Sequence, residues 1–211
     1  RVAPLVQQLK AAHNIEFFSI GGGVGIIYDP ALESGSPDWW AQQNDDELTI
    51  EKYATEIVPR LKKLGLRILL EPGRYIAGNA GVLLTECLYE KKGSAKTFKV
   101  VDSGMNDLIR PALYEGHHQI VPIREDQRTP LVKADVVGPI CESGDFFCQD
   151  RDIADVQSGD LLALMSAGAY GFTMASNYNT RPMPAEILVD ATEAKVIRRR
   201  QSLEDLIALE K

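Results

Sequence analysis

The chain has 211 residues, of which 45% are hydrophobic and 25% charged, a balance typical of an ordinary globular protein. Its 30 acidic and 23 basic residues give a net charge of −7, which argues against a nucleic-acid partner. No apolar stretch approaches the length of a membrane span, no signal peptide is visible, and three cysteines without CxxC spacing favour a reduced, cytoplasmic setting without structural zinc.

The first 70 residues predict alternating helices and strands. Residues 2–12 have a helical pattern and residues 15–20 an apolar strand pattern, followed by a polar loop over 30–46 that carries Trp39 and Trp40. The clearest helix runs from Ile50 to Leu64, with Thr49 placed to cap it and Gly65 to end it. Residues 67–70 lack alternation, as expected of a strand that is covered on both faces.

After about residue 80 the pattern changes to short strand-like runs separated by turn residues. These runs are Val82–Tyr89, Thr97–Val101, Gln119–Ile123, Lys133–Val137, Leu161–Met165 and Glu186–Val189. Only Ser202–Leu209 returns to a helical pattern, with Ser202 and Asp205 in a capping-box relation, and the basic residues 198–200 read as a solvated approach to that helix. We therefore expect the end of an α/β domain over residues 1–80 and a mostly antiparallel β domain over 81–211.

Two turns in the first domain come directly after strand patterns. The first contains Gly21, Gly22 and Gly23, where the absence of Cβ atoms lets backbone N–H groups approach an anion such as phosphate. It matches neither a Walker A loop nor a dinucleotide-binding fingerprint. The second is Glu71-Pro72-Gly73-Arg74, whose arginine suits phosphate or carboxylate; a local Glu71–Arg74 salt bridge is the alternative interpretation. Together the turns predict an anionic ligand at one edge of a sheet, where α/β folds bind ligands.

Three segments of the β domain carry further candidate residues. Arg110 and Tyr114 are expected on a non-repetitive loop within residues 101–114. Cys141 and Glu142 stand between Gly-Pro and Ser-Gly-Asp, which predicts an accessible thiol on a turn, where it can act as an acid or a nucleophile. Tyr170 is set among small residues after a buried strand pattern, an arrangement that suits a phenol directed at a ligand.

These motifs occur in one order: GGG after a strand, EPGR, NDLIRPALY, GPICESGD, AGAYG and ASNYNTRP. In that order and spacing, over about residues 15–190, the chain resembles the diaminopimelate decarboxylase family, pyridoxal-phosphate enzymes with the alanine-racemase-like fold. The resemblance implies the last βα units of a cofactor-binding (β/α)₈ barrel, followed by a mostly antiparallel, β-barrel-like C-terminal domain. It also implies a homodimer with shared active sites and decarboxylation of meso-2,6-diaminopimelate to L-lysine, the last step of lysine biosynthesis.

The resemblance also implies a role for each motif. Cys141 would be the catalytic acid that protonates the carbanion left when CO₂ departs. Residues implied to bind pyridoxal 5′-phosphate are Gly22, Gly23, Glu71, Pro72, Gly73, Arg74 and Tyr170, with Glu71 facing the pyridine nitrogen. Residues implied to bind the substrate are Arg74, Arg110, Tyr114, Glu142 and Tyr170, with Glu142 on the distal ammonium group.

One departure from the family pattern concerns the lysine that forms the Schiff base with the cofactor. Neither this lysine nor the histidine that stacks on the cofactor ring is identifiable here. The chain begins at Arg1 within a helical pattern, and a (β/α)₈ barrel needs about 200 residues. We therefore expect the chain to be the later part of a longer polypeptide, inactive by itself.

Several alternative functions stay open at this point. The same scaffold hosts decarboxylases of ornithine, arginine and carboxynorspermidine, although Glu142 and the residues around Arg110 suit a substrate charged at both ends. A non-catalytic homologue that binds a partner would be free to lose Arg74 and Cys141, and both are present. Alanine racemase is a weaker hypothesis, since that chemistry needs a second catalytic base, which the residues flanking Cys141 do not resemble.

Overall fold

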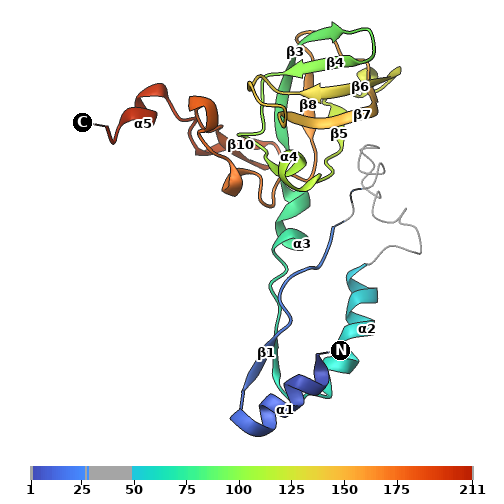
Figure 1. Cartoon of the computed structure of the whole chain (residues 1–211), viewed down its shortest axis with the longest axis vertical. Helices are drawn as coiled ribbons and strands as arrows, with labels where there is room; N and C mark the ends of the chain where they lie inside the picture. The colour runs from blue at the N-terminus through green and yellow to red at the C-terminus, as the bar shows by residue number, and fades with distance from the viewer. Residues whose placement is uncertain (1, 27, 29–48, 211) are drawn as a thin grey trace. The chain divides into compact units, whose positions relative to one another are not determined.

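The structure of the chain is a computed structural model that describes residues 2–26, 28 and 49–210. The chain divides into two compact units, Arg1–Asn79 and Ala80–Lys211 (Figure 1). The polar loop expected over residues 30–46, with Trp39 and Trp40, lies outside the described residues. No helix in the described part of the chain has both the length and the apolar character needed to cross a membrane.

The first unit contains three α-helices and two strands in its described residues. They are α1 (Ala3–His13), β1 (Phe17–Ser19), α2 (Ile50–Lys62), β2 (Arg67–Leu69) and α3 (Gly73–Ala77). Helix α2 begins as predicted, because the Thr49 hydroxyl accepts a hydrogen bond from the Lys52 amide at 3.3 Å. Gly65, shortly after the end of α2, adopts a φ of +61°, which glycine tolerates without strain.

Strands β1 and β2 pair in parallel, with Phe17 opposite Arg67 and Ser19 opposite Leu69. Parallel pairing brings the carboxyl ends of both strands to the same edge. The expectation that β2 is covered on both faces is wrong for the described residues, since Leu69 is 38% and Leu70 49% exposed. A two-stranded sheet offers too little surface to bury both faces of a strand.

The second unit is built on a six-stranded sheet. Its strands are β3 (Leu83–Lys92), β4 (Thr97–Val101), β5 (Ile120–Pro122), β6 (Leu131–Val137), β7 (Phe146–Ala154) and β8 (Leu161–Leu164), in the order β5-β8-β3-β4-β6-β7. Neighbouring strands are antiparallel except for β4 and β6, so the sheet is mixed. It curls into a nearly closed barrel (Figure 1), and Arg151 of β7 donates to the His118 carbonyl before β5 at 2.9 Å.

The interior of this barrel-like sheet holds the main apolar core, which includes Cys87, Val101, Val136 and Leu164. One charged side chain is also fully buried there. The Lys99 ammonium donates to Asp155 Oδ1 at 2.7 Å, to the Val156 carbonyl at 2.8 Å and to the Glu90 carboxylate. Three acceptors match its three N–H donors, so the buried charge is paired and hydrogen-bonded.

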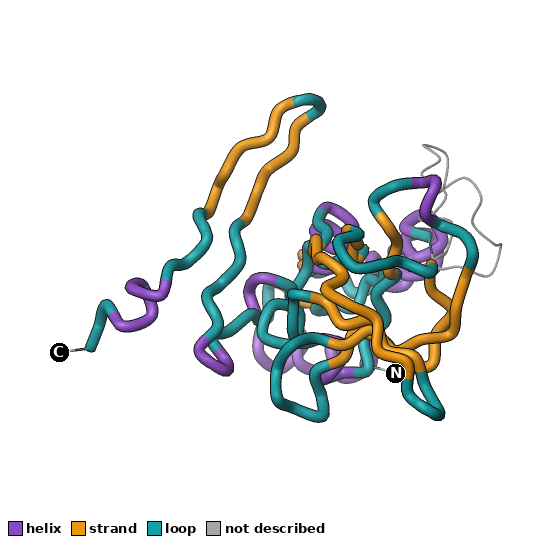
Figure 2. The backbone as a smooth tube through the Cα atoms, turned by 90° about the horizontal axis from the view of Figure 1, so that it is seen from above, coloured by secondary structure: helices purple, strands orange, loops and turns teal. Residues whose placement is uncertain are grey.

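The remaining elements of the second unit are a short helix, a hairpin and a terminal helix. They are α4 (Arg110–Tyr114), β9 (Glu186–Asp190), β10 (Glu193–Arg198) and α5 (Leu203–Ile207). The β9–β10 hairpin extends away from the six-stranded sheet (Figure 2). The predicted capping box of α5 is confirmed, because Ser202 and Asp205 exchange hydrogen bonds between side chain and backbone.

The structure differs from the sequence-based expectations at three places in this unit. Strand β7 was not predicted, because the polar residues 149–152 in its middle resemble a turn. Strand β10 was not predicted either, because Arg198 was grouped with Arg199 and Arg200 as the approach to a helix. Arg198 belongs to the strand, whereas Arg199 does pair with Asp205 of α5. Residues 110–114 form helix α4 instead of a non-repetitive loop, with Pro111 near its start, where the missing N–H costs nothing.

Candidate functional site

The two turns of the first unit lie side by side. The Ile20 amide donates to the Leu69 carbonyl at 3.1 Å, and the Glu71 amide donates to the Gly21 carbonyl at 2.9 Å, so the pairing of β1 and β2 continues into both turns. Gly22 lies so close to the second turn that an added Cβ would be 2.7 Å from the Glu71 carbonyl oxygen. This approach of backbone to backbone explains why glycine is needed at position 22.

The glycine turn has the geometry of an anion-binding loop. Gly21 and Gly23 adopt φ values of +72° and +81°, and the Gly21 amide donates to the Ser19 hydroxyl at 3.1 Å. Among the described residues no acceptor takes the amides of Gly22 and Gly23. Successive N–H groups of this kind can bind a phosphate oxygen.

Glu71 and Arg74 do not form an ion pair with each other in the described part of the structure. Glu71 Oε1 accepts from the Ser19 hydroxyl at 2.7 Å, and Arg74 Nη1 donates to the Tyr28 hydroxyl at 2.9 Å. The Glu71 side chain is exposed at the edge of the two-stranded sheet. Pro72 and Gly73 lead into α3, and the Gly73 amide donates to the Glu71 carbonyl at 2.9 Å.

In the second unit, Cys141 and Glu142 lie exposed on a turn between β6 and β7, as predicted. Asp145 organises this turn from its C-terminal end. Its Oδ1 accepts from the Met105 amide at 2.7 Å and its Oδ2 from the Ile140 amide at 2.6 Å. The Asp145 amide also donates to the Glu142 carbonyl at 3.0 Å, so the turn is tied at both ends.

The Asp145 carboxyl group is buried, with 4% exposure. Burial raises the pKa of Asp145, while the hydrogen bonds from the Ile140 and Met105 amides act in the opposite direction. Gly138 makes room for this carboxylate, since a Cβ there would be 2.5 Å from Asp145 Oδ2. The glycine of the Gly-Pro pair is therefore required by Asp145, which sequence reasoning left without a role.

Glu142 has a partner that the sequence analysis did not single out. The Tyr178 hydroxyl donates to Glu142 Oε2 at 3.3 Å. The negative charge of Glu142 raises the pKa of Tyr178, so the phenol stays a donor. Arg181 anchors the same segment, because its Nε donates to Asn106 Oδ1 at 3.0 Å and its Nη2 to the Asp102 carbonyl at 2.6 Å.

Arg110 and Tyr114 lie at opposite ends of α4 and in different surroundings. Arg110 is 6% exposed, whereas Tyr114 is 60% exposed. Arg110 Nη1 lies 2.7 Å from His118 Nε2, and His118 Nδ1 lies 2.8 Å from the Met165 carbonyl oxygen. Arg110 Nε is buried and has no acceptor among the described residues.

Tyr170 lies on a constrained turn after β8. It adopts a φ of +63°, and a Cβ at the following Gly171 would be 2.3 Å from the Ala167 carbonyl oxygen. The Ala167 amide donates to the Gly81 carbonyl at 2.8 Å, which fixes the base of the turn. Tyr170 is about half exposed.

The segment before and through α4 is the meeting point of these loops. A Cβ at Gly144 would lie 3.8 Å from the Ala112 side chain, and one at Gly171 would lie 3.7 Å from Leu108. The turns that carry Cys141 and Tyr170 therefore both adjoin residues 105–112. Within the first unit, the glycine turn and the Glu71–Arg74 turn adjoin each other in the same way.

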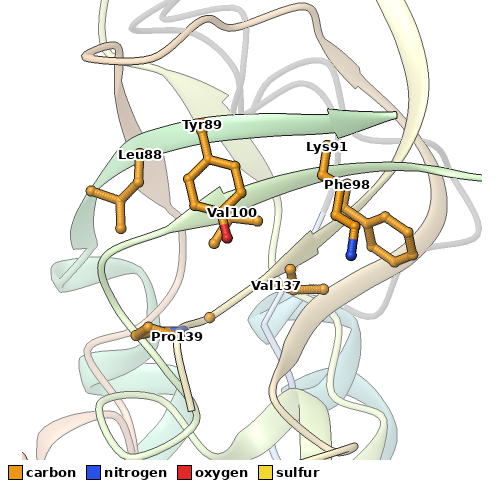
Figure 3. A pocket seen from close by; sticks show the side chains of 8 residues that line it. Leu88, Tyr89, Lys91, Phe98, Val100, Val137 and Pro139 are labelled. Atoms are coloured by element: carbon orange, nitrogen blue, oxygen red, sulfur yellow. The ribbon is translucent and has the colours of Figure 1, made fainter. Parts of the chain in front are cut away.

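A separate hollow of about 380 Å³ lies on strands β3, β4 and β6 (Figure 3). Its lining is mainly apolar and aromatic, with a single lysine: Leu88, Tyr89, Lys91, Phe98, Val100, Val137, Gly138 and Pro139. None of the predicted site residues lines it. The candidate residues predicted from the sequence therefore lie outside this hollow.

Comparison with known proteins places the chain in a family. Residues 25–168 match the pyridoxal-dependent decarboxylases of ornithine, diaminopimelate and arginine in their C-terminal sheet domain, and the chain belongs to this family. The family is pyridoxal-dependent, in agreement with the cofactor expected from the sequence motifs.

Two similar relatives and one similar solved structure are named diaminopimelate decarboxylases. The relative from Aquifex aeolicus is 42% identical over 98% of this chain and 46% of its own length, and that from Neisseria meningitidis serogroup A is 44% identical over 100% and 48%. A solved structure of the Helicobacter pylori enzyme complexed with L-lysine has a TM-score of 0.81 and 40% identity, over 99% of this chain and 48% of that one. The chain thus spans about half the length of the relatives it matches.

Proposed function

We propose that the protein containing this chain decarboxylates meso-2,6-diaminopimelate to L-lysine and CO₂, with pyridoxal 5′-phosphate as cofactor. In this proposal residues 1–80 are the C-terminal part of a cofactor-binding (β/α)₈ barrel. Residues 81–211 form the domain that supplies substrate contacts. The proposed activity is the one that the names of the similar relatives give for those proteins.

One observation carries the proposal above all others. An exposed thiol, Cys141, and a carboxylate, Glu142, stand next to each other on a turn that Asp145 holds by two short hydrogen bonds. A group that must deliver a proton to carbon needs both access to the substrate and a fixed position. A fixed turn with an exposed thiol meets both conditions.

The turns of the first unit fit the cofactor's phosphate group. The amides of Gly22 and Gly23, without acceptors among the described residues, and the Arg74 guanidinium supply donors for phosphate oxygens. Pro72 and Gly73, which stand between Glu71 and Arg74 in the second turn, would border the cofactor with them. Glu71 Oε1 accepts a hydrogen bond from the Ser19 hydroxyl, so its Oε2 would accept a hydrogen bond from the protonated pyridine nitrogen of the cofactor. Bound in this way, pyridoxal phosphate supplies an electron sink for the carbon that loses CO₂.

The groups of the second unit suit a substrate that is charged at both ends. Arg110 and Tyr114, with Arg74 of the first unit, would bind carboxylate groups, and Glu142 would bind the distal ammonium group. Because Tyr178 already donates to Glu142 Oε2, the Oε1 atom would face the substrate. Tyr170 would contact the cofactor phosphate or the substrate.

Cys141 would complete the reaction by transferring a proton. When the carbon–carboxyl bond breaks, its electron pair stays on the α-carbon, and the Cys141 thiol would give its proton to that carbon. The resulting thiolate would recover a proton from water, to which the exposed side chain has access. We propose that Cys141 and Glu142 act in a homodimer with shared active sites.

The proposed reaction is tested by assaying the protein containing this chain for L-lysine formation from meso-diaminopimelate, with and without added pyridoxal phosphate. We expect cofactor-dependent turnover, and we expect Cys141→Ala to lower kcat by about 10²-fold or more, the usual contribution of a positioned acid. A wild-type protein that forms no L-lysine would overturn the proposed function. An unimpaired Cys141→Ala variant would refute only the role of the thiol.

The isolated 211-residue chain is proposed to be inactive, because none of its lysines follows a barrel strand in the manner that the family requires. Mixed with one equivalent of pyridoxal phosphate and then dialysed, it should retain no lysine aldimine, because imines at exposed lysines are weak and reverse on dialysis. An absorbance band of such an adduct, abolished by borohydride, would contradict this part of the proposal.

A further inference from the structure

The guanidinium group of Arg110 is held by a second buried side chain. His118 is fully buried, and its Nε2 lies 2.7 Å from Arg110 Nη1. The two residues come from different elements, since Arg110 opens α4 and His118 precedes β5. Sequence analysis gave His118 no role.

The partners of His118 fix its tautomer. The Met165 carbonyl, 2.8 Å from His118 Nδ1, can only accept a hydrogen bond, so Nδ1 carries the proton. Arg110 Nη1 can only donate, so His118 Nε2 must present its lone pair. The ring is therefore neutral, and it joins the backbone after β8 to the guanidinium of Arg110.

This contact determines which donors of Arg110 remain for a ligand. Nη1 is engaged by His118, whereas Nε is buried without an acceptor among the described residues. Nη2 lies beside Gly116, where an added Cβ would be 3.2 Å away. Nε and Nη2 form one edge of the planar guanidinium, and such an edge matches the two oxygens of a carboxylate.

We propose that His118 is a positioning residue that holds the Nε–Nη2 edge of Arg110 in place for a carboxylate of the substrate. The inference rests on the proposed function, because it deepens the role of Arg110 in the same site. His118 itself touches no substrate. A change at His118 should therefore weaken only the binding of ligands that carry this carboxylate. A purely structural role would instead affect ligands with and without it alike.

The test uses two probes that differ in that one group. L-lysine carries a carboxylate, and cadaverine is the same molecule without it. Binding of each to the cofactor-loaded protein containing this chain is measured by calorimetry for the wild type, His118→Asn and His118→Gln. Asparagine can still donate to the Met165 carbonyl but does not reach Arg110, whereas the glutamine Oε1 can replace Nε2 as the acceptor.

His117→Gln is the matched control, because the neighbouring His117 contacts Gln119 and Arg151.

We expect His118→Asn to weaken L-lysine binding about tenfold, the effect of losing one hydrogen bond to a charged group, and to leave cadaverine binding unchanged. The KM for diaminopimelate should rise by a similar factor with a smaller change in kcat. His118→Gln and His117→Gln should stay within about threefold of the wild type for both probes, since each keeps an acceptor for Arg110.

Equal weakening of both probes, or unchanged L-lysine binding in His118→Asn, would overturn the inference. If His118→Asn does not fold, His118→Leu, which also offers no acceptor to Arg110, replaces it: a loss of L-lysine binding with cadaverine binding unchanged supports positioning, and unchanged or equally weakened binding of both probes contradicts it. A wild-type protein that neither binds L-lysine nor decarboxylates diaminopimelate would instead refute the proposed function on which the inference rests.

Discussion

At the scale of single residues, the candidate site depends on polar side chains that organise the backbone around the reacting groups. Asp145 is the clearest case, because its buried carboxylate accepts from two amides and thereby fixes the turn of Cys141 and Glu142. Cys141, Glu142 and Tyr170 could be selected from sequence by their unusual neighbours. Asp145 and His118 could not, because each also has a partner far away in the sequence: Met105 lies 40 residues from Asp145, and Met165 lies 47 residues from His118.

Asp145→Asn tests this organising role. An amide offers one acceptor oxygen where the carboxylate offers two, so the Met105 or the Ile140 N–H would lose its partner. We expect the free energy of unfolding to fall by about 1–3 kcal/mol, with slower turnover and unchanged cofactor affinity. Urea unfolding checks the first outcome, and Asp152→Asn, at an exposed position of β7, serves as the control. Wild-type stability and turnover in Asp145→Asn would contradict the assigned role.

At the scale of elements, strong local signals made two helices predictable, one in each unit. The apolar stripe and Thr49 cap of α2 and the capping box of α5 are local features, and both helices form as predicted. Strand β7 was missed because residues 149–152 in its middle are polar. Only their pairing with β6 shows that they belong to a strand. Helix α4 was missed because five residues carry too little periodicity to recognise.

The pairing of β1 with β2 predicts a sharp difference between two glycines of the first turn. Gly22→Ala would place a Cβ 2.7 Å from the Glu71 carbonyl oxygen, whereas a Cβ at Gly25 meets nothing within 4 Å. In the cofactor-binding protein, we expect Gly22→Ala to weaken pyridoxal phosphate binding about tenfold or more by separating the two turns. Gly25→Ala should bind as the wild type does in a fluorescence titration, and equal effects of both substitutions would refute the proposed phosphate loop.

Helix α5 should respond to acid through its capping box. Hydrogen bonds from the Arg199 guanidinium, and then from the Ser202 amide, hold the pKa of Asp205 well below its usual range. Because the pKa of Asp205 is lower in the folded than in the unfolded state, its carboxylate contributes its full stabilisation of the helix at pH values above about 4. This contribution is lost as the pH falls through the folded-state pKa.

The expected loss is measured by NMR Cα chemical shifts of residues 203–207 in a titration towards low pH. The shifts should move towards coil values in the wild type and much less in Asp205→Asn, where only Glu204 still titrates at this helix start. The pKa of Glu204 is also lowered, by a hydrogen bond from its own amide and by one with the Ser202 side chain. An identical titration in Asp205→Asn would exclude the capping carboxylate as the cause.

At the scale of the whole molecule, the order of the motifs was more informative than any motif alone. A glycine turn or a lone cysteine has ordinary explanations, but six motifs in one order over most of the chain predicted the family, and this prediction is confirmed. The accessibility of β2 could not be predicted, because covering a strand depends on other elements. The same holds for the β9–β10 hairpin, whose side chains are almost all exposed.

The central claim is that Cys141, Glu142 and the arginines of this chain act on a substrate with an amino and a carboxyl group at each end. It is tested most directly by supplying the cofactor-loaded protein with equal concentrations of meso-diaminopimelate and L-ornithine and quantifying both products by mass spectrometry. Ornithine lacks the distal carboxylate, and a site built to bind such a group rejects the analogue by about 10⁴-fold or more. We therefore expect L-lysine in large excess, and putrescine as the main product would contradict this assignment of the substrate.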